Sequence, residues 1–228
     1  MRKSLRNASL IAAAGSGLVL SAGLARGDIV TNSPSLPPIG HTYREYENGQ
    51  LVWVTYQASA DLLNHIPTGL IGTTTDGVND TESFDSELTG VVSIGSNPLT
   101  QNVPIDLTGP VSVEVFGHTG MTTGTWNTQM LSMDLTETFT SGPLIGNSVE
   151  ITLDPNNPTT GQTSVTDLGG GLYDISSFFD VFTDLSINGG PLAPANGYTE
   201  VVLVPEPASL TLLGVGAFAL CMRRRKSA

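Results

Sequence analysis

The sequence predicts an all-β fold for residues 28–203, a two-sheet antiparallel β-sandwich placed between two terminal segments of different composition. Apolar and polar residues alternate in several stretches, as in residues 111–115, where Ser112 and Glu114 separate three valines. This period of two is typical of a strand with one buried face. Glycine, proline and asparagine punctuate the stretches, and no long amphipathic helix pattern occurs. We therefore expect about seven to nine strands.

The first predicted element is a β-hairpin. Residues 41–47 and 50–57 flank Asn48-Gly49, the strongest short signal for a type I′ turn. A two-residue turn pairs Glu47 with Gln50 and places Arg44 beside Trp53 on one face. Such a cation–π contact is worth about 0.5–1 kcal/mol when exposed, and we interpret it as structural.

A loop is predicted over residues 64–79, and strands separated by turn residues follow it. Apolar side chains share one parity within these strands, which indicates one buried face per sheet. The predicted strands are 88–94, 111–116, 129–135, 149–153, 163–168, 172–175 and 179–187. Residues 198–203 are either a last strand or a linker.

The N-terminal segment has the three parts of a secretory signal peptide. They are a basic region with Arg2, Lys3 and Arg6, an apolar region at 8–24, and the small residues of Ala25-Arg26-Gly27. We expect the signal peptide to occupy residues 1–27 and its cut to precede Asp28. An export translocase is then the first partner.

The C-terminal segment, residues 204–228, also has three parts. They are Pro205, Glu206 and Pro207, an uncharged run at 208–222, and a basic stop of Arg223, Arg224, Arg225 and Lys226. As a helix the run spans about 22 Å, less than the ~30 Å hydrocarbon core, so we expect a transient transmembrane anchor. The basic cluster is expected to stay in the cytoplasm, which leaves residues 28–203 outside. The two prolines hold the chain at Glu206 extended, a shape that suits a processing enzyme.

This tail resembles the PEP-CTERM sorting signal of exported bacterial proteins, which the transpeptidase-like membrane enzyme exosortase handles. The resemblance rests on residues 204–209, the apolar run and the basic stop, about a tenth of the chain. It implies removal of the tail near Pro205-Glu206-Pro207 and delivery to the cell surface or extracellular matrix. The alternative is a plain, uncleaved C-terminal anchor. Residues 124–135 and 169–190 also resemble stretches of uncharacterised PEP-CTERM proteins, a resemblance that implies no activity.

Charge and cysteine content exclude several classes of function for residues 28–203. Of the 21 acidic residues only Glu206 lies outside this range, and of the 9 basic residues only Arg44 lies inside it, which gives a formal charge of −19. Such a domain cannot neutralise phosphates, so nucleic acid is excluded as a partner. Because the single cysteine, Cys221, lies in the tail, the domain has no disulfide or thiolate chemistry.

The sequence contains no recognisable catalytic or metal-binding motif. No G-x-S-x-G occurs, and His41, His65 and His118 are isolated. A pair of glycosidase carboxylates could still meet in space. The acids between Asp76 and Glu87 could hold Ca²⁺, but a solvated acidic loop is the simpler interpretation. We therefore assign no catalytic, cofactor-binding or metal-binding residue.

Two classes of function stay open. The first is a non-enzymatic structural, adhesive or carbohydrate-binding module at the cell surface or in the matrix, with Trp126 or Trp53 as a platform for a sugar. Core packing is nevertheless the first expectation for both tryptophans. The second class is a secreted hydrolase that acts on extracellular polysaccharide. The absence of a nucleophile, metal or cofactor motif favours the first class.

Overall fold

Every regular element that the structure describes is a strand. The computed structural model describes residues 28–31, 35–46, 50–53, 58–95, 101–142 and 144–204. The strands are β1 (Asp28–Thr31), β2 (Tyr43–Tyr46), β3 (Gln50–Trp53), β4 (Ala58–Thr75), β5 (Asp80–Ile94), β6 (Gln101–Val115), β7 (Gly124–Thr138), β8 (Ser148–Leu153), β9 (Thr159–Gly169), β10 (Leu172–Val181), β11 (Thr183–Ile187), β12 (Ala193–Pro194) and β13 (Thr199–Leu203). The prediction of an all-β, antiparallel fold is confirmed. Within these ranges no helix is long and apolar enough to cross a membrane.

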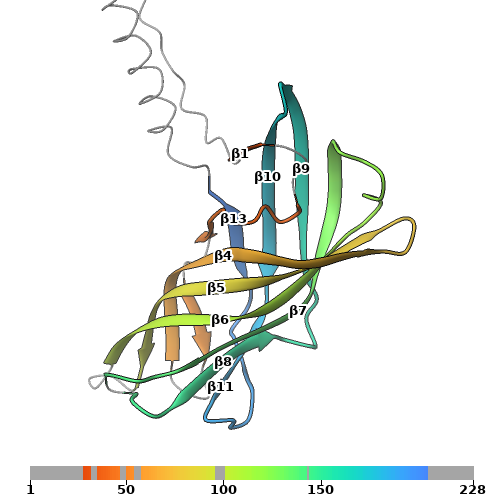
Figure 1. The fold of residues 1–228 in the computed structure, drawn as a ribbon. Helices are drawn as coiled ribbons and strands as arrows, with labels where there is room; N and C mark the ends of the chain where they lie inside the picture. The colour runs from red at the N-terminus through yellow and green to blue at the C-terminus, as the bar shows by residue number, and fades with distance from the viewer. Residues whose placement is uncertain are drawn as a thin grey trace, which may run out of the picture.

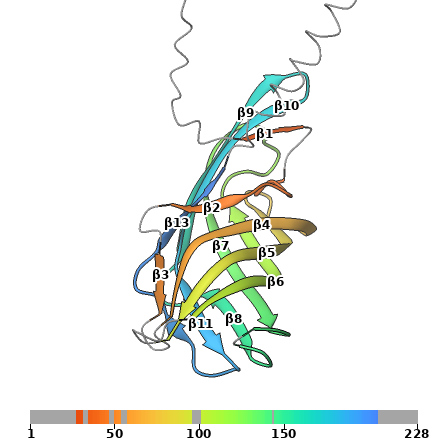
Figure 2. The ribbon, with the colours of Figure 1, turned by 90° about the vertical axis from the view of Figure 1, so that its left-hand side faces the viewer.

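The strands form one sheet of 13 strands, not two separate sheets. Its order is β1-β10-β13-β2-β4-β5-β6-β7-β8-β11-β12, with β3 beside β4. Strand β9 pairs with both β10 and β7, so the ladder from β10 through β13, β2, β4, β5, β6 and β7 returns to its start. Figures 1 and 2 show β4, β5 and β6 curving across one side of the molecule, with β9, β10 and β13 behind them.

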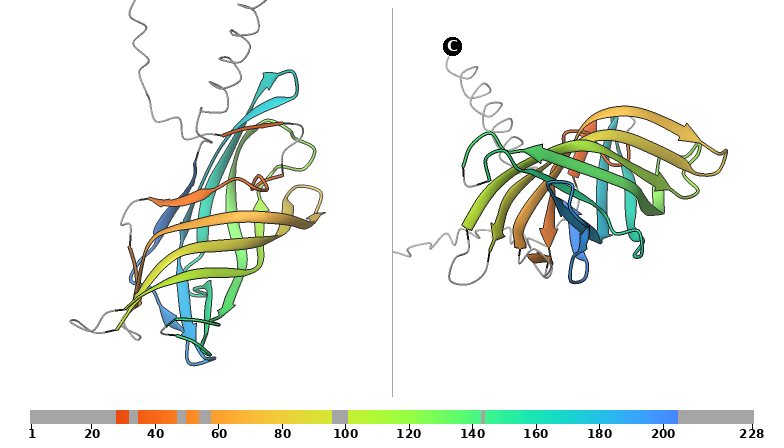
Figure 3. Two further views of the ribbon diagram at one scale, coloured as in Figure 1. Left: turned by 60° about the vertical axis from the view of Figure 1, so that its left-hand side comes forward. Right: turned by 90° about the horizontal axis from the view of Figure 1, so that it is seen from below.

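Strand length explains why two separate sheets do not form. Strand β7 pairs with β9 along its first half, from Gly124 to Met130, and with β8 along its second half, from Asp134 to Thr138. The single curved strand β7 therefore connects the part of the sheet that contains β9 with the part that contains β8. Figure 3 (right) shows the orange-to-green strands β4–β7 arching round the blue strands.

The core fills the space inside this curved sheet. On β6 the buried residues share one parity, from Val103 to Val115, as the alternation predicts. The largest fully buried side chains come from eight strands and one loop: Trp53, Phe84, Leu36, Leu107, Leu135, Ile151, Ile175, Leu185 and Leu203, among others. Each buried side chain of this size contributes about 1.5–3 kcal/mol relative to exposure, so these residues hold the layers together.

Two glycines allow neighbouring strands to approach each other closely. A Cβ atom at Gly109 on β6 would overlap the carbonyl oxygen of Asp134 on β7. A Cβ atom at Gly161 on β9 would overlap the carbonyl oxygen of Phe178 on β10. At both positions a side chain would push neighbouring strands apart.

The predicted hairpin at Asn48-Gly49 is wrong. Strands β2 and β3 both pair antiparallel with β4, so they run in the same direction, one after the other. Arg44 lies opposite Asn64 on β4 and Val202 on β13, whereas Trp53 lies opposite Ala58. The predicted Arg44–Trp53 pair is therefore not formed; Asn48 and Gly49 themselves lie outside the described residues. The long strand β4 offers β2 and β3 more hydrogen-bonding partners than the two short strands offer each other.

The predicted loop at 64–79 is also wrong over most of its length. Strand β4 continues to Thr75, and the turn is confined to Asp76–Asn79. Register shifts occur between Pro67 and Gly69 and between Leu70 and Gly72, so glycine and proline mark irregularities within a strand here and not its end. The later predicted strands fall on observed ones, but the predicted strand 179–187 is divided between the end of β10 and β11. Residues 199–203 form β13 and not a linker.

Candidate functional site

The two ends of the described domain meet at one place, which we call the terminal pole: β1, residues 35–41 and the end of β13. Strands β1 and β13 lie one after the other along the same edge of β10. Asp28 is opposite Ile175 and Val202 is opposite Phe178. Along β10, the positions of Asp28 and Val202 are therefore three residues, or about 10 Å, apart. Residues 28 and 204, next to the two predicted processing sites, are therefore close neighbours.

The chain is held firmly up to the residue before the predicted sorting motif. Strand β13 pairs with β10 on one side and β2 on the other. The Val204 N–H then donates a hydrogen bond of 2.9 Å to the Thr42 carbonyl oxygen. The motif residues Pro205, Glu206 and Pro207 and the basic stop at 223–226 lie outside the described residues. The described fold thus holds the chain as far as Val204, which directly precedes the motif.

Asp28, the expected first residue after removal of the signal peptide, is buried. Only 4% of it is exposed, and its Oδ2 atom lies 2.5 Å from His41 Nδ1. Its Oδ1 atom accepts a hydrogen bond of 2.8 Å from the Ile29 N–H. The contact with His41 fixes the start of β1 against residues 35–41, a role that no sequence pattern indicates.

Residues 35–41 close this end of the core. Leu36 is 1% exposed, and its N–H donates a hydrogen bond of 3.0 Å to Glu82 Oε2. The Gly40 N–H donates to the Pro67 carbonyl oxygen at 2.6 Å. Burial raises the pKa of the Glu82 carboxyl to about 7, although the bond from Leu36 opposes that shift. A carboxylate from β5 therefore anchors a segment 46 residues away in sequence.

The acidic stretch from Asp76 to Glu87 does not form a solvated loop. Asp76 accepts hydrogen bonds from its own turn, from the Val78 and Asn79 N–H groups, which lower its pKa. Asp80 accepts hydrogen bonds from Thr119 Oγ1 and His118 Nδ1, each at 2.7 Å. Glu82 is buried at the terminal pole. Asp80 and Glu82 lie on one face of β5 but contact different partners. The described ranges contain no group of three His, Cys, Asp or Glu residues placed to hold a metal ion.

The three histidines occupy separate contacts. His41 pairs with Asp28, and His118 pairs with Asp80. The ring of His118 also packs edge-to-face with that of Trp126, and the two ring centres are 4.7 Å apart. The ring of His65 is buried between the layers, where its Nε2 atom contacts Ser86 Oγ, and burial lowers its pKa to about 4. Among the described residues the histidines therefore share no common site.

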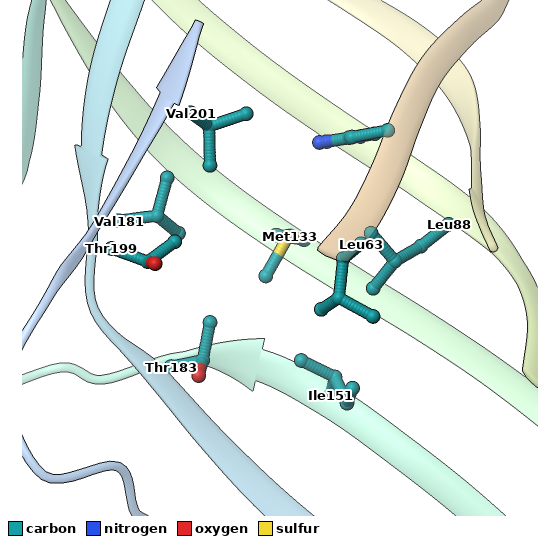
Figure 4. Close-up of a pocket in the computed structure, with 9 residues that line it drawn as sticks. Leu63, Leu88, Met133, Ile151, Val181, Thr183, Thr199 and Val201 are labelled. Atoms are coloured by element: carbon teal, nitrogen blue, oxygen red, sulfur yellow. The ribbon is translucent and has the colours of Figure 1, made fainter. Parts of the chain in front are cut away.

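Two small cavities lie among the described residues inside the curved sheet. One, of about 30 Å³, is lined by Leu63, His65, Leu88, Met133, Ile151, Val181, Thr183, Thr199 and Val201, and Figure 4 shows their side chains converging on it. A volume of this size holds one or two water molecules. Trp53 and Trp126 are 0% and 7% exposed. Core packing of both tryptophans is confirmed, and neither offers a surface platform to a sugar.

A hollow lies on the surface beside the first half of β6. It has a volume of about 260 Å³ and is lined by residues 103–106, 137 and 139–142. Glu137 Oε2 accepts a hydrogen bond of 2.8 Å from the Asp106 N–H; Asp106 is exposed and Glu137 is half-buried. Two carboxylates thus border this groove, and no sequence pattern indicates the pair because 31 residues separate them.

Comparison with known proteins gives one finding. The model of the PEP-CTERM protein-sorting motif matches residues 203–226. No curated protein and no solved structure matches the chain. The motif indicates export and processing by an exosortase-type membrane enzyme, through a membrane-anchored intermediate, towards the cell surface. The chain is a protein with a PEP-CTERM sorting domain, which its residues 203–226 supply.

Proposed function

We propose that this chain delivers a non-enzymatic structural or adhesive domain to the cell surface or extracellular matrix of a bacterium. In this proposal a translocase exports it through the signal peptide at 1–27, and a transmembrane helix at 208–222 then holds it with residues 223–226 inside. An exosortase-type enzyme cuts near Pro205-Glu206-Pro207 and releases the domain that begins at Asp28.

The observation that carries this proposal is the position of the sorting motif relative to the fold. The last hydrogen bond of the domain ends at Val204, and the motif starts at Pro205. An enzyme at the membrane can therefore reach the motif without unfolding any of the described strands. Cutting there leaves the core and every strand intact.

The chemistry of the domain supports a non-enzymatic role. Asp28, Asp80 and Glu82 are each used in contacts that hold segments of the fold together. The formal charge of −19 over residues 28–203 favours solubility and repels other anionic surfaces. A densely acidic, closely packed domain suits a protein that occupies the extracellular space. The burial of both tryptophans makes carbohydrate binding the least supported form of this role.

The sorting step is tested by measuring the intact mass of the protein recovered from the cell surface or medium. We expect a form that begins at Asp28 and lacks Cys221 and the basic stop. Glu206→Ala should insert in the membrane normally but abolish release, because the motif is read by the enzyme and not by the bilayer. Thr211→Ala, within the apolar run, is the matched control and should be released like the parent. Surface protein that ends at Ala228, or normal release of Glu206→Ala, would leave only an uncleaved anchor.

A hydrolase that acts on extracellular polysaccharide is the second candidate, and the groove beside Asp106 and Glu137 is the observation that favours it. Paired carboxylates beside a groove are what glycoside hydrolysis requires. The assay is the release of reducing sugar ends from extracellular polymer by the secreted protein. Activity that disappears in both Asp106→Asn and Glu137→Gln would establish the hydrolase and refute the non-enzymatic role. Binding of polymer without release of sugar supports the adhesive role.

A further inference from the structure

The β9–β10 hairpin projects past the end of β13 at the terminal pole (Figures 1 and 2). Val202 lies opposite Phe178, and β10 extends six residues from Phe178 back to Leu172, where the hairpin turns. The tip therefore stands about 20 Å beyond the level of Val202. Six residues also lead from Val202 to Ala208, where the apolar run of the tail begins. Even a fully extended tail carries Ala208 no farther than this tip.

The tip has the composition of a segment that can touch lipid. Residues 168–173 read Leu-Gly-Gly-Gly-Leu-Tyr and carry no charge. Leu168 is 52% exposed and Leu172 is 40% exposed, although each belongs to a strand. Ile29 on the adjoining strand β1 is 57% exposed. Large apolar side chains exposed together at one tip mark an interaction surface.

Two carboxylates limit how deep this tip can go. Asp167 and Asp174 flank it, both exposed, and Asp174 lies opposite Ile29. Asp167 Oδ1 accepts a hydrogen bond of 2.7 Å from the Gly169 N–H, which holds the turn in shape. Charged groups stay in water at a membrane surface, while leucine enters the acyl boundary and tyrosine prefers the headgroup level. The arrangement permits shallow contact only.

We propose that residues 168–173 contact the lipid bilayer while the C-terminal tail anchors the chain. This inference rests on the anchored intermediate of the proposed function. With β10 along the membrane normal, the short connection at 204–207 brings the tip to the lipid surface, and Leu168 and Leu172 lose their exposure to water there. The formal charge of −19 opposes adsorption to anionic lipids, so the contact depends on the tether and ends when the domain is released.

The experiment uses the full chain in phosphatidylcholine vesicles. Since the domain has no cysteine, Cys221→Ser removes the only native thiol, and Leu172→Cys then carries a single environment-sensitive fluorophore. The matched control is Ile145→Cys, which is 65% exposed in the β7–β8 turn at the opposite end of the sheet. We expect the label at 172 to shift to shorter wavelength when vesicles are added. Nitroxide lipids should quench it at least about twofold more than the label at 145.

Flotation of the same samples separates the two ways in which the proposal can fail. If the chain floats with the vesicles but the labels at 172 and 145 respond alike, the hairpin contact is refuted and the anchor stands. If the chain does not float, the anchor and the contact are both refuted. In the chain labelled at 172, Leu168→Ser should reduce the difference between the tip and the control without changing flotation, whereas Leu192→Ser at the opposite end should leave it intact.

Discussion

The terminal pole and the four long strands β4–β7 are held by different kinds of contact. Strands β5 and β6 pair without interruption from Asp80 opposite Val115 to Ile94 opposite Gln101. At the terminal pole, β1 is four residues long and pairs with β10. Residues 35–41 are held there by two carboxyl groups: Asp28 contacts His41, and Glu82 accepts a hydrogen bond from the Leu36 N–H.

This difference predicts a difference in cooperativity. A continuous ladder opens only when many hydrogen bonds break together, so the amide protons that pair β5 with β6 should exchange only on global unfolding. The terminal pole depends on a few polar contacts and one inserted leucine, so it should open locally. One of those contacts uses the Glu82 carboxyl, whose pKa burial raises to about 7, so the hold on this segment is sensitive to pH. A few individual side chains thus stabilise the terminal pole, whereas many repeated backbone hydrogen bonds stabilise the long strands.

The largest expected effect is the loss of a core leucine, which tests this comparison directly. Leu107 on β6 and Leu36 at the terminal pole are 0% and 1% exposed. Leu107→Ala should lower the free energy of unfolding by about 2–5 kcal/mol, because it leaves a cavity between the long strands. Leu36→Ala should instead speed amide exchange mainly in residues 28–41. Equal loss of global stability in both variants would show that the pole belongs to the same cooperative unit.

The next effect concerns two buried groups whose pKa values are shifted in opposite directions. The pKa of Glu82 rises from 4.5 to about 7, so its contribution to stability falls as the pH rises through that window. The pKa of His65 falls from 6.5 to about 4, so its contribution falls as the pH drops through that window. Each shift corresponds to about 3 kcal/mol, and between pH 4.5 and 6.5 the two slopes oppose each other.

Denaturant unfolding at several pH values measures this balance. Relative to the parent, Glu82→Gln should gain stability as the pH rises from 4.5 to 7, because the cost of burying its charge is removed. His65→Gln should show the opposite trend relative to the parent between pH 4 and 6.5. Parallel pH profiles for all three proteins would mean that neither group is buried as described.

A smaller effect is expected when either of the two histidine–aspartate contacts is removed, and the two removals should affect different regions. Asp28 holds His41 at the pole, and Asp80 holds His118 between the turns at 76–79 and 116–123. Removing a charge-assisted hydrogen bond costs about 1.5–3 kcal/mol when buried and less when it is partly exposed. Asp28→Asn should therefore increase proteolysis in residues 28–41, whereas Asp80→Asn should change only exchange in its two turns. Enhanced cleavage of residues 28–41 in Asp80→Asn would contradict the separation of the regions.

The smallest expected effect is that of calcium. Because Asp76, Asp80 and Glu82 are engaged in different contacts, added Ca²⁺ should leave the melting temperature unchanged. A clear rise that disappears in Asp80→Ala with Glu82→Ala would reveal a cation site in the acidic stretch. The parent protein in Mg²⁺ is the matched control for ionic strength.

Local patterns in the sequence were sufficient for the fold class and for the tail. Alternation at residues 111–115 predicts a strand with one buried face, because successive side chains point to opposite sides. It correctly indicates the buried parity of β6. The order of Pro205-Glu206-Pro207, apolar run and basic stop indicates the sorting motif, because each part acts through its own composition. These features need no knowledge of distant neighbours.

The tertiary structure alone decided which segments became partners. Asn48-Gly49 suits a hairpin, yet β2 and β3 pair with β4 instead, because pairing energy depends on the strand that lies alongside. The sequence predicts that Glu82 lies in a solvated acidic loop, but the fold buries it against Leu36, which is 46 residues away in the sequence. The meeting of Asp28 with the end of β13 likewise depends on a shared neighbour, β10, that lies far from both in sequence. Local patterns report which face of a segment is apolar, whereas only the folded chain determines what lies against it.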